Sequence, residues 1–319
     1  MTDEMESTYD VVVVGGGAAG LSGALMLGRA RRAVLVVDAG EPRNAPAAGV
    51  HGFLSRDGVK PAELVEVGRA EVRGYGGHVV DGRVRAAVRD GDGFTVTLDD
   101  GRTVRGRRLL VTTGLVDELP DVPGVRGRWG HDVLHCPYCH GWEVRDQPVG
   151  VLASGPFSIH QTFLFRQWTS DLTLLLHDQP APDPTDVEKL EALGVKIVGG
   201  EVGSIEVVDD RIVAVRLQQG SVVPLQAVVV APRFIARSEA LATLGLEPTP
   251  DPRGLGAHIP ADATGLTAVP GVWVAGNVTD LGANVVVAAA QGATAAVTMN
   301  LDLINEDAQR AVAARRARL

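Results

Sequence analysis

The chain has 319 residues, of which 45% are hydrophobic and 22% are charged, and its formal net charge is -9. This length suits about two domains, and the negative charge argues against a nucleic-acid partner. No apolar run approaches the roughly 20 residues of a membrane span, and the N-terminal MTDEMESTYD lacks the apolar core of a signal peptide, so we expect a cytoplasmic protein without a membrane partner.

Residues 10–38 read as a strand, a glycine-rich turn, a helix and a second strand. The run YDVVVV is typical of a buried parallel strand, and Gly15, Gly17 and Gly20 follow it in the spacing G-x-G-x-x-G. The second strand ends at Asp38. This context predicts a dinucleotide site, because glycine lets the backbone approach a pyrophosphate at the helix N-terminus while an acidic side chain binds a ribose.

The same plan recurs later in the chain. Residues 94–114 predict a hairpin that turns at Asp99–Gly101, and residues 211–232 predict another that turns at Gln218–Gly220. Before the second hairpin, residues 148–179 again read as strand, turn, helix and strand. The sequence therefore predicts two related dinucleotide-binding units.

The second unit interrupts the first, because residues 269–280 supply a further strand of the first unit. We expect an α/β protein with two Rossmann-like domains of the three-layer type. The FAD-binding domain implied below would comprise 1–118 and 236–319, with an inserted domain at 119–235.

The only two cysteines, Cys136 and Cys139, lie in HCPYCHGWE at 135–143. This spacing suits a small, reversible disulfide ring, and Pro137 fits the first turn of a helix, whose N-terminus lowers a thiol pKa. Zinc is the metal alternative, but the spacing is too short to surround the ion and a second C-x-x-C is absent, so we expect no metal. Two inert buried cysteines are the other alternative.

Five motifs resemble the low-molecular-weight thioredoxin reductases: GGGAAG, TTG at 112–114, LPDVPG, the C-x-x-C followed by Gly141, and VAGNVTD. The resemblance implies a homodimer with FAD in the first unit and NADPH in the inserted unit. It places the FAD contacts at Gly15, Gly17, Ala18, Ala19, Gly20, Asp38, Ala39, Arg43, Asn44, His51, Val84, Gly114, Gly276, Asn277, Asn284 and Val285. Asn277 stands where the family usually carries aspartate.

The inserted unit departs from the family at its nucleotide turn. Ala153 and Ser158 replace the first and third glycines, and Pro156 removes a backbone donor. His177-Asp178-Gln179 stands where the family has His-Arg-Arg, and acidic residues there repel a 2'-phosphate. These changes predict that NADPH no longer binds productively, although Asp178 leaves weak NADH binding open.

By resemblance, Cys139 is the flavin-side thiol and Cys136 exchanges with substrate. His140 stands where typical thioredoxin reductases carry an acid/base aspartate. Histidine titrates near neutral pH and can deprotonate a thiol, which favours oxidation of a dithiol. His135 is either a second base or a structural histidine.

A closer resemblance rests on CPYCHGWE, EPRN at 41–44 and HGFLSRDG at 51–58. These motifs are similar to the dithiol oxidases of antibiotic and other natural-product pathways, which form the disulfides of gliotoxin, holomycin and romidepsin; the bacterial holomycin type is nearest in character. The resemblance implies that Cys136 and Cys139 pass electrons from a small-molecule dithiol to FAD, and that O2 becomes H2O2. The alternatives are a disulfide reductase that uses NAD(P)H or a protein donor, and a non-enzymatic redox sensor that holds FAD.

Overall fold

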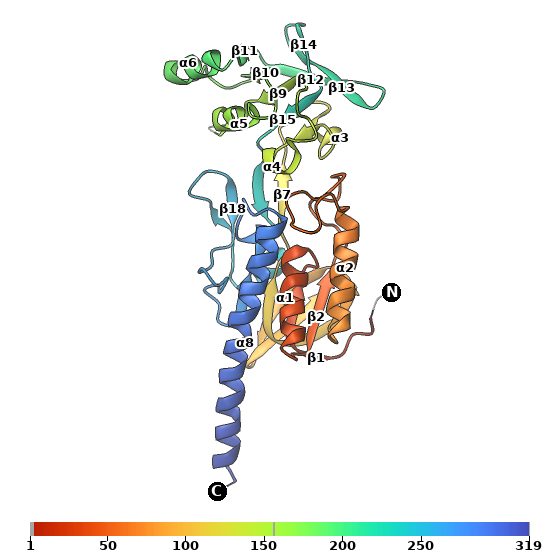
Figure 1. Ribbon diagram of the computed structural model, residues 1–319. Coiled ribbons are helices and arrows are strands. Elements are labelled where there is room, and N and C mark those ends of the chain that lie inside the picture. Colours follow the sequence, from red (N-terminus) through yellow and green to blue (C-terminus); the bar gives the residue numbers. More distant parts are fainter. Residues whose placement is uncertain (1–2, 156, 319) are drawn as a thin grey trace. The chain divides into compact units, whose positions relative to one another are not determined.

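The computed structural model describes residues 3–155 and 157–318, which form two compact units (Figure 1). The first unit comprises the described residues of Met1–Ala45, Pro61–Val116 and Phe234–Leu319, and the second comprises those of Pro46–Lys60 and Asp117–Arg233. The chain passes between the units at each end of Pro46–Lys60, and again within strands β7 (Leu115–Glu118) and β16 (Arg233–Ala236).

The structure differs from the expected ranges at residues 46–60, which belong to the second unit. It also differs by two residues at the later boundaries, since 117–118 belong to the second unit and 234–235 to the first. The physical reason for the placement of 46–60 is long-range contact. A Cβ placed on Gly130 would lie 2.6 Å from Pro46 Cβ, so that only glycine allows this approach. His51 faces Glu143 in the same unit.

The first unit is built on a seven-stranded sheet whose buried β-branched runs pair in parallel. Its order is β3-β2-β1-β6-β5-β4, and β19 also pairs with β6. The strands are β1 (Thr8–Val14), β2 (Val34–Asp38), β3 (His78–Asp81), β4 (Val84–Asp90), β5 (Gly93–Leu98), β6 (Thr103–Val111) and β19 (Val272–Val274). The parallel pairing of β19 with β6 confirms that the chain returns to the first unit after the insertion.

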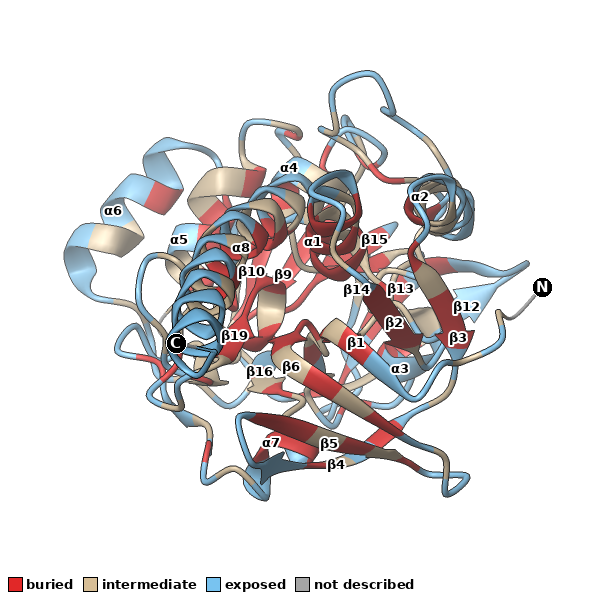
Figure 2. Cartoon of the chain, turned by 90° about the horizontal axis from the view of Figure 1, so that it is seen from below, coloured by how far each residue is buried: buried red, intermediate tan, exposed pale blue. Residues whose placement is uncertain are grey.

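The two faces of this sheet bury different layers, as the period-two alternation of strands requires. Val11 and Val13 pack against helices α1 (Ala18–Arg29) and α8 (Val285–Arg316), whereas Val12 and Val14 pack toward β4 and β5. Figure 2 shows the buried residues gathered on the strands and the inner faces of these helices. The three layers agree with the expected architecture. The remaining elements are α2 (Pro61–Gly74), α7 (Glu239–Ala242), β17 (Thr249–Pro250), β18 (Gly256–His258) and η1 (Gly276–Val278).

Small residues bring α1 and α8 together (Figure 1). A Cβ on Gly292 would lie 1.9 Å from the Ala19 carbonyl oxygen, so only glycine permits this crossing. This packing fixes the start of α1, which carries the first nucleotide turn.

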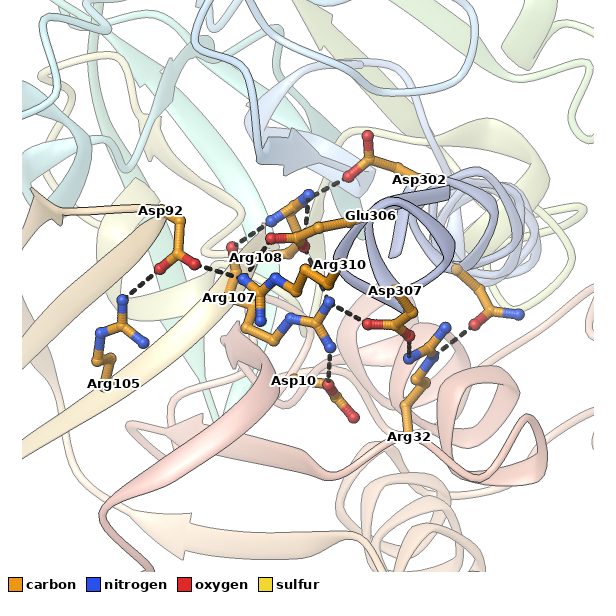
Figure 3. A network of polar contacts seen from close by, with 11 residues as sticks. Asp10, Arg32, Asp92, Arg105, Arg107, Arg108, Asp302, Glu306, Asp307 and Arg310 are labelled. Carbon is orange, nitrogen blue, oxygen red and sulfur yellow. Dashed lines mark hydrogen bonds and ion pairs between the residues drawn. The ribbon is translucent and has the colours of Figure 1, made fainter. Parts of the chain in front are cut away.

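A network of ion pairs fastens the second half of α8 to the sheet (Figure 3). Arg107 on β6 contacts Asp10 at 2.7 Å, Glu306 at 2.9 Å and Asp307 at 2.5 Å. Arg108 contacts Glu306 at 3.1 Å. The surrounding pairs involve Arg32, Asp92, Arg105, Asp302 and Arg310. Because the carboxylates stabilise the cation, the pKa of Arg107 is raised even though burial alone would lower it.

The second unit repeats the pattern on a smaller scale. Its five-stranded parallel sheet has the order β11-β10-β9-β15-β8, and a separate antiparallel sheet has the order β12-β13-β14. The strands are β8 (Val133–Leu134), β9 (Val149–Leu152), β10 (Leu172–Leu175), β11 (Lys196–Val198), β12 (Val202–Val208), β13 (Arg211–Leu217), β14 (Val222–Pro224) and β15 (Ala227–Val229). The helices are α3 (Val125–Arg128), α4 (Pro137–His140), α5 (Ser158–Phe165) and α6 (Pro184–Ala192).

The predicted repeat is present in both units. Strand β9 pairs in parallel with β10 and β15, as β1 pairs with β2 and β6. Both predicted hairpins form, and Gly101 and Gly220 in their turns have φ of 88° and 97°. Glycine is favoured at such angles because it has no Cβ to clash. No helix in the described ranges is long and apolar enough to cross a membrane.

Candidate active site

The first nucleotide turn is shaped to admit a pyrophosphate. Gly15 has φ of 106°, and a Cβ on Gly20 would lie 1.9 Å from the Gly15 carbonyl oxygen. A Cβ on Gly17 would meet nothing within 4 Å, so the turn is open on that side. Helix α1 begins after Gly17 without a side-chain cap, which leaves its first N–H groups available to an anion.

Asp38 stands at the end of β2, where a ribose is expected. Its Oδ1 accepts a hydrogen bond from the Gly16 N–H at 3.0 Å, and its Oδ2 accepts one from Arg69 at 2.5 Å. A carboxylate has about four acceptor positions, so Asp38 retains capacity for a ribose hydroxyl. Arg69 lies on α2, and sequence reasoning missed it because nothing in a helical stripe marks one arginine as the partner of a distant aspartate.

A second group of predicted residues meets around the start of α8. Asn277 donates to the carbonyls of Asp280 and Ala283 at 3.0 and 2.8 Å, and its Oδ1 accepts from Arg43 at 3.2 Å. Asn284 caps α8 by accepting from the Val287 N–H at 3.1 Å. The amide of Asn277 therefore orders this loop.

The remaining predicted cofactor residues fall into two groups. Those in the first unit lie at the start of α1, after β2, at the start of β4, after β6 and around η1 and α8: Ala18, Ala19, Ala39, Asn44, Val84, Gly114, Gly276 and Val285. His51 belongs to the second unit and is grouped there with Glu143. The open turn, the uncapped helix and Asp38 fit FAD.

The two cysteines form a disulfide, with Cα atoms 5.2 Å apart. Cys136 is the N-cap of α4, and both the Cys139 and His140 N–H groups donate to its carbonyl oxygen, at 3.2 and 3.1 Å. Pro137 occupies the first turn, as predicted. Because α4 has only four residues, its dipole is small. Both cysteines are half-buried, which leaves them room for exchange.

His140 ends α4 directly after the disulfide. Burial lowers its pKa, the nearby Glu143 carboxylate acts in the opposite direction, and His51 lowers the pKa further. A lowered pKa keeps the imidazole neutral near pH 7, which is the form that takes a proton from a thiol.

His51 lies between two carboxylates. Its Nε2 is 3.5 Å from Glu143 Oε1, and its Nδ1 is 3.5 Å from Asp57 Oδ2. Asp57 is itself held by the Gly52 N–H at 2.8 Å, which lowers the pKa of Asp57. The second unit thus groups four titratable side chains, of which His140 directly follows Cys139 in the chain. Sequence reasoning missed Glu143, although its position three residues after His140 was the available signal.

His135 is held by backbone contacts. Its Nδ1 is 3.1 Å from the Val230 carbonyl oxygen, and Gln161 donates to the His135 carbonyl at 2.8 Å. These contacts favour a structural histidine over a second base. Gln161 on α5 is 5% exposed and was also missed, since a buried glutamine inside a helix has no sequence signature.

Two serine side chains make hydrogen bonds within the nucleotide turn of the second unit, although a Cβ on its middle glycine, Gly155, would meet nothing within 4 Å, as for Gly17 in the first turn. The Ser154 N–H donates to Ser158 Oγ at 3.0 Å, and Ser154 Oγ donates to the Ala231 carbonyl at 3.1 Å. Ser158 is 1% exposed, so its hydroxyl occupies the interior of the turn. Pro156, which the sequence analysis also weighed, lies outside the described residues.

No lysine or arginine that could bind a 2'-phosphate follows β10 in the described chain before Lys189. His177 accepts from the Val202 N–H at 3.0 Å, and Asp178 accepts from Gln179 at 2.7 Å. Lys189, the first cation along the chain from there, pairs with Asp186 at 2.8 Å. These contacts leave this end acidic.

The chain matches the family model of the pyridine nucleotide-disulphide oxidoreductases over residues 9–292. It belongs to this family. Thioredoxin reductase sirT of Leptosphaeria maculans is 32% identical over 262 residues, covering 76% of this chain and 80% of that protein. Thioredoxin reductase tcpT of Claviceps purpurea is 37% identical over 151 residues, but that alignment spans 46% of this chain and 47% of the relative.

Solved structures agree with this assignment. The crystal structure of HlmI matches with a TM-score of 0.92 and 47% identity, covering the whole of both chains. An oxidoreductase from Agrobacterium tumefaciens matches with a TM-score of 0.87 and 34% identity, covering 93% of this chain and 99% of that one. The protein is therefore a flavoprotein oxidoreductase that acts on sulfur groups, with FAD as its cofactor. This confirms the resemblance to thioredoxin reductases and the expected fold class.

Proposed function

We propose that the protein is an FAD-dependent dithiol oxidase, which closes an intramolecular disulfide in a small-molecule natural product and passes the electrons to O2, giving H2O2. The observation that carries the proposal is a hydrogen bond in the turn of the second unit, where Ser158, at the position of the third glycine, occupies the Ser154 N–H with its Oγ. An electron donor other than a nicotinamide is then needed, and the Cys136–Cys139 disulfide accepts electrons from thiols.

Two features of the second unit act against NADPH, one in the turn and one at the end of β10. A pyrophosphate would have to displace the hydroxyl of Ser158 from a backbone N–H, which costs about 1 kcal/mol for the lost hydrogen bond. The acidic end of β10 would then repel a 2'-phosphate instead of pairing with it. Both effects lower affinity for the reduced cofactor.

The residues of the second unit supply the thiol chemistry. His140 takes the proton of the first substrate thiol, and the thiolate attacks Cys136 Sγ, so the Cys136–Cys139 bond breaks and Cys139 leaves as a thiolate. His140 returns the proton to Cys139 and then takes the proton of the second thiol. That thiolate attacks the substrate sulfur of the mixed disulfide, and Cys136 leaves. Two electrons have moved from the substrate to the cysteine pair.

FAD, when bound, accepts these two electrons from the cysteine pair and delivers them to O2. In this chain the first turn, Asp38 and the loop around Asn277 would hold it. Two aromatic side chains beside the disulfide suit an apolar substrate, since Tyr138 and Trp142 are 69% and 64% exposed. Arg145 stacks over the Trp142 ring at 4.2 Å and fixes its orientation.

The names of the relatives support a second candidate, a disulfide reductase that takes electrons from NAD(P)H or a protein donor. One experiment separates the two. Purified holoenzyme with dithiothreitol and no nicotinamide should consume O2 and produce H2O2, while NADPH without oxygen should leave the flavin oxidised. Rapid anaerobic bleaching by NADPH, with no oxygen uptake on dithiol, would favour the reductase.

Variants of the site complete this test. Cys136→Ser should abolish oxygen uptake with FAD still bound, whereas unchanged turnover would favour a redox sensor whose cysteines play no part. We also expect a homodimer in the cytoplasm from the family resemblance, and light scattering of the holoenzyme tests the oligomeric state.

A further inference from the structure

The cluster around His140 contains two groups that the proposed reaction leaves without a role, Glu143 and His51. Glu143 follows α4 in the turn after the disulfide, and its side chain is 40% exposed. His51 comes from residues 46–60, far away in the sequence, and its side chain is 26% exposed. Both act on His140, in opposite directions.

Electrostatics explains the opposition. The Glu143 carboxylate stabilises the positive charge that forms on His140 when it takes a proton from a thiol, as an acidic partner does for a catalytic histidine in hydrolases. His51 lies against the same carboxylate, with Nε2 at 3.5 Å from Oε1. A proton on His51 therefore compensates the charge of Glu143 and also repels an imidazolium at His140.

The titratable groups that act on His140 come from two elements. Glu143 lies on the turn after α4, and His51 lies on the 46–60 segment. Asp57 faces the other nitrogen of His51 at 3.5 Å and competes with Glu143 for that ring. The contact between His51 and Glu143 therefore places His51 where it can weaken the electrostatic effect of Glu143 on His140.

We propose that Glu143 and His51 are positioning residues for the base His140, with Glu143 supporting its protonated form and His51 moderating that support. The inference rests on the proposed function, because it assigns the pair a part in thiol deprotonation. It gives the 46–60 segment a role in the chemistry of the second unit.

The structure predicts opposite effects of two substitutions. Glu143→Gln removes the charge but keeps the shape, so the titration midpoint of His140 should move to lower pH. His51→Asn removes the ring that lies against the Glu143 carboxylate and lowers the pKa of His140, so the midpoint should move to higher pH. Glu188→Gln, on exposed helix α6, makes the same charge change away from the cluster and should leave the midpoint unchanged.

The midpoint is measured by NMR of the labelled holoenzyme, using the imidazole resonance that disappears in His140→Gln. FAD content is checked by absorbance in each variant. The rate of anaerobic flavin reduction by dithiothreitol is then followed from pH 5 to pH 9. On the alkaline plateau, this rate should be about fivefold lower for Glu143→Gln than for the wild type, because removing one unit charge in water-like surroundings has an effect of that size. Glu143→Asp should restore part of the rate.

The outcomes separate the two proposals. Shifts of the midpoint in opposite directions, together with the slower plateau, support the positioning pair. Shifts in the same direction, no shift, or shifts without any change in rate overturn it. The proposed oxidase fails independently if wild-type holoenzyme with a dithiol takes up no O2, whatever the midpoints do.

Discussion

The altered turn and the acidic end of β10 in the second unit predict that substitutions there can raise the affinity for NADPH. We consider Ala153→Gly and Ser158→Gly, which return the two missing glycines, combined with Asp178→Arg, which places a cation at the end of β10. The Ser158 change frees the Ser154 N–H, now held at 3.0 Å, for a pyrophosphate oxygen. The Asp178 change replaces repulsion of the 2'-phosphate by attraction.

The magnitude follows from these contacts. Releasing one neutral hydrogen bond contributes about 1 kcal/mol, and reversing one partly exposed charge near a phosphate contributes about 1–2 kcal/mol. The sum of about 2–3 kcal/mol corresponds to an NADPH affinity higher by about 30- to 150-fold. Asp121→Arg, an exposed residue of the same unit with the same change of charge, is the matched control and should gain little.

The assay is a fluorescence titration of NADPH with the oxidised holoenzyme, with flavin bleaching followed anaerobically as a second readout. The triple variant should bind NADPH measurably more tightly than wild type, and the control should not. Equal, tight binding by the wild type and the variant would refute the reasoning, because the turn would then admit the cofactor as it is.

Three further predictions concern the holoenzyme. Gly20→Ala should release FAD, because its Cβ would lie 1.9 Å from the Gly15 carbonyl oxygen, and loss of the flavin absorbance after gel filtration measures this; retained flavin would contradict it. Gln161→Leu removes the donor to the His135 carbonyl and leaves a buried acceptor less satisfied. The free energy of unfolding, measured by thermal unfolding, should fall by about 1–3 kcal/mol, while the first unit should keep its FAD. Glu306→Gln should destabilise the protein by about 1–2 kcal/mol at pH 7, since Glu306 contacts Arg107 and Arg108. The ion pairs lower the pKa of Glu306 in the folded state, so this stability is present above the unfolded pKa of about 4.3 and is lost as pH falls through the lower folded pKa. Urea titrations at pH 7 and pH 3 should show a smaller difference between the variant and the wild type at pH 3.

The sequence was most informative where structure is local. The turn after β1, the two hairpins and the return strand β19 all follow from short patterns, since strand periodicity and glycine spacing act over a few residues. The disulfide pair and His140 were found for the same reason, because one motif of nine residues carries them.

Long-range contacts were beyond such reasoning. The placement of residues 46–60 in the second unit depends on Pro46 meeting Gly130 and on His51 meeting Glu143. Arg107 pairs with Glu306 and Asp307, which lie about 200 residues away in the chain. From the sequence, the arginines of β6 could therefore be interpreted only as polar strand positions. No pattern within either segment identifies such pairs.

In the altered turn of the second unit, the Ser154 N–H donates to Ser158 Oγ and the Ser154 hydroxyl donates to the Ala231 carbonyl. Helix α5, which begins at this turn, sends Gln161 to the carbonyls of His135 and Val230, at 2.8 and 3.2 Å. The helix that would support a pyrophosphate in an open turn therefore supports the residue that precedes Cys136. A shift of α5 would disturb the residue that precedes Cys136, so we expect the framework of the second unit to support the thiol site whether or not a nucleotide binds.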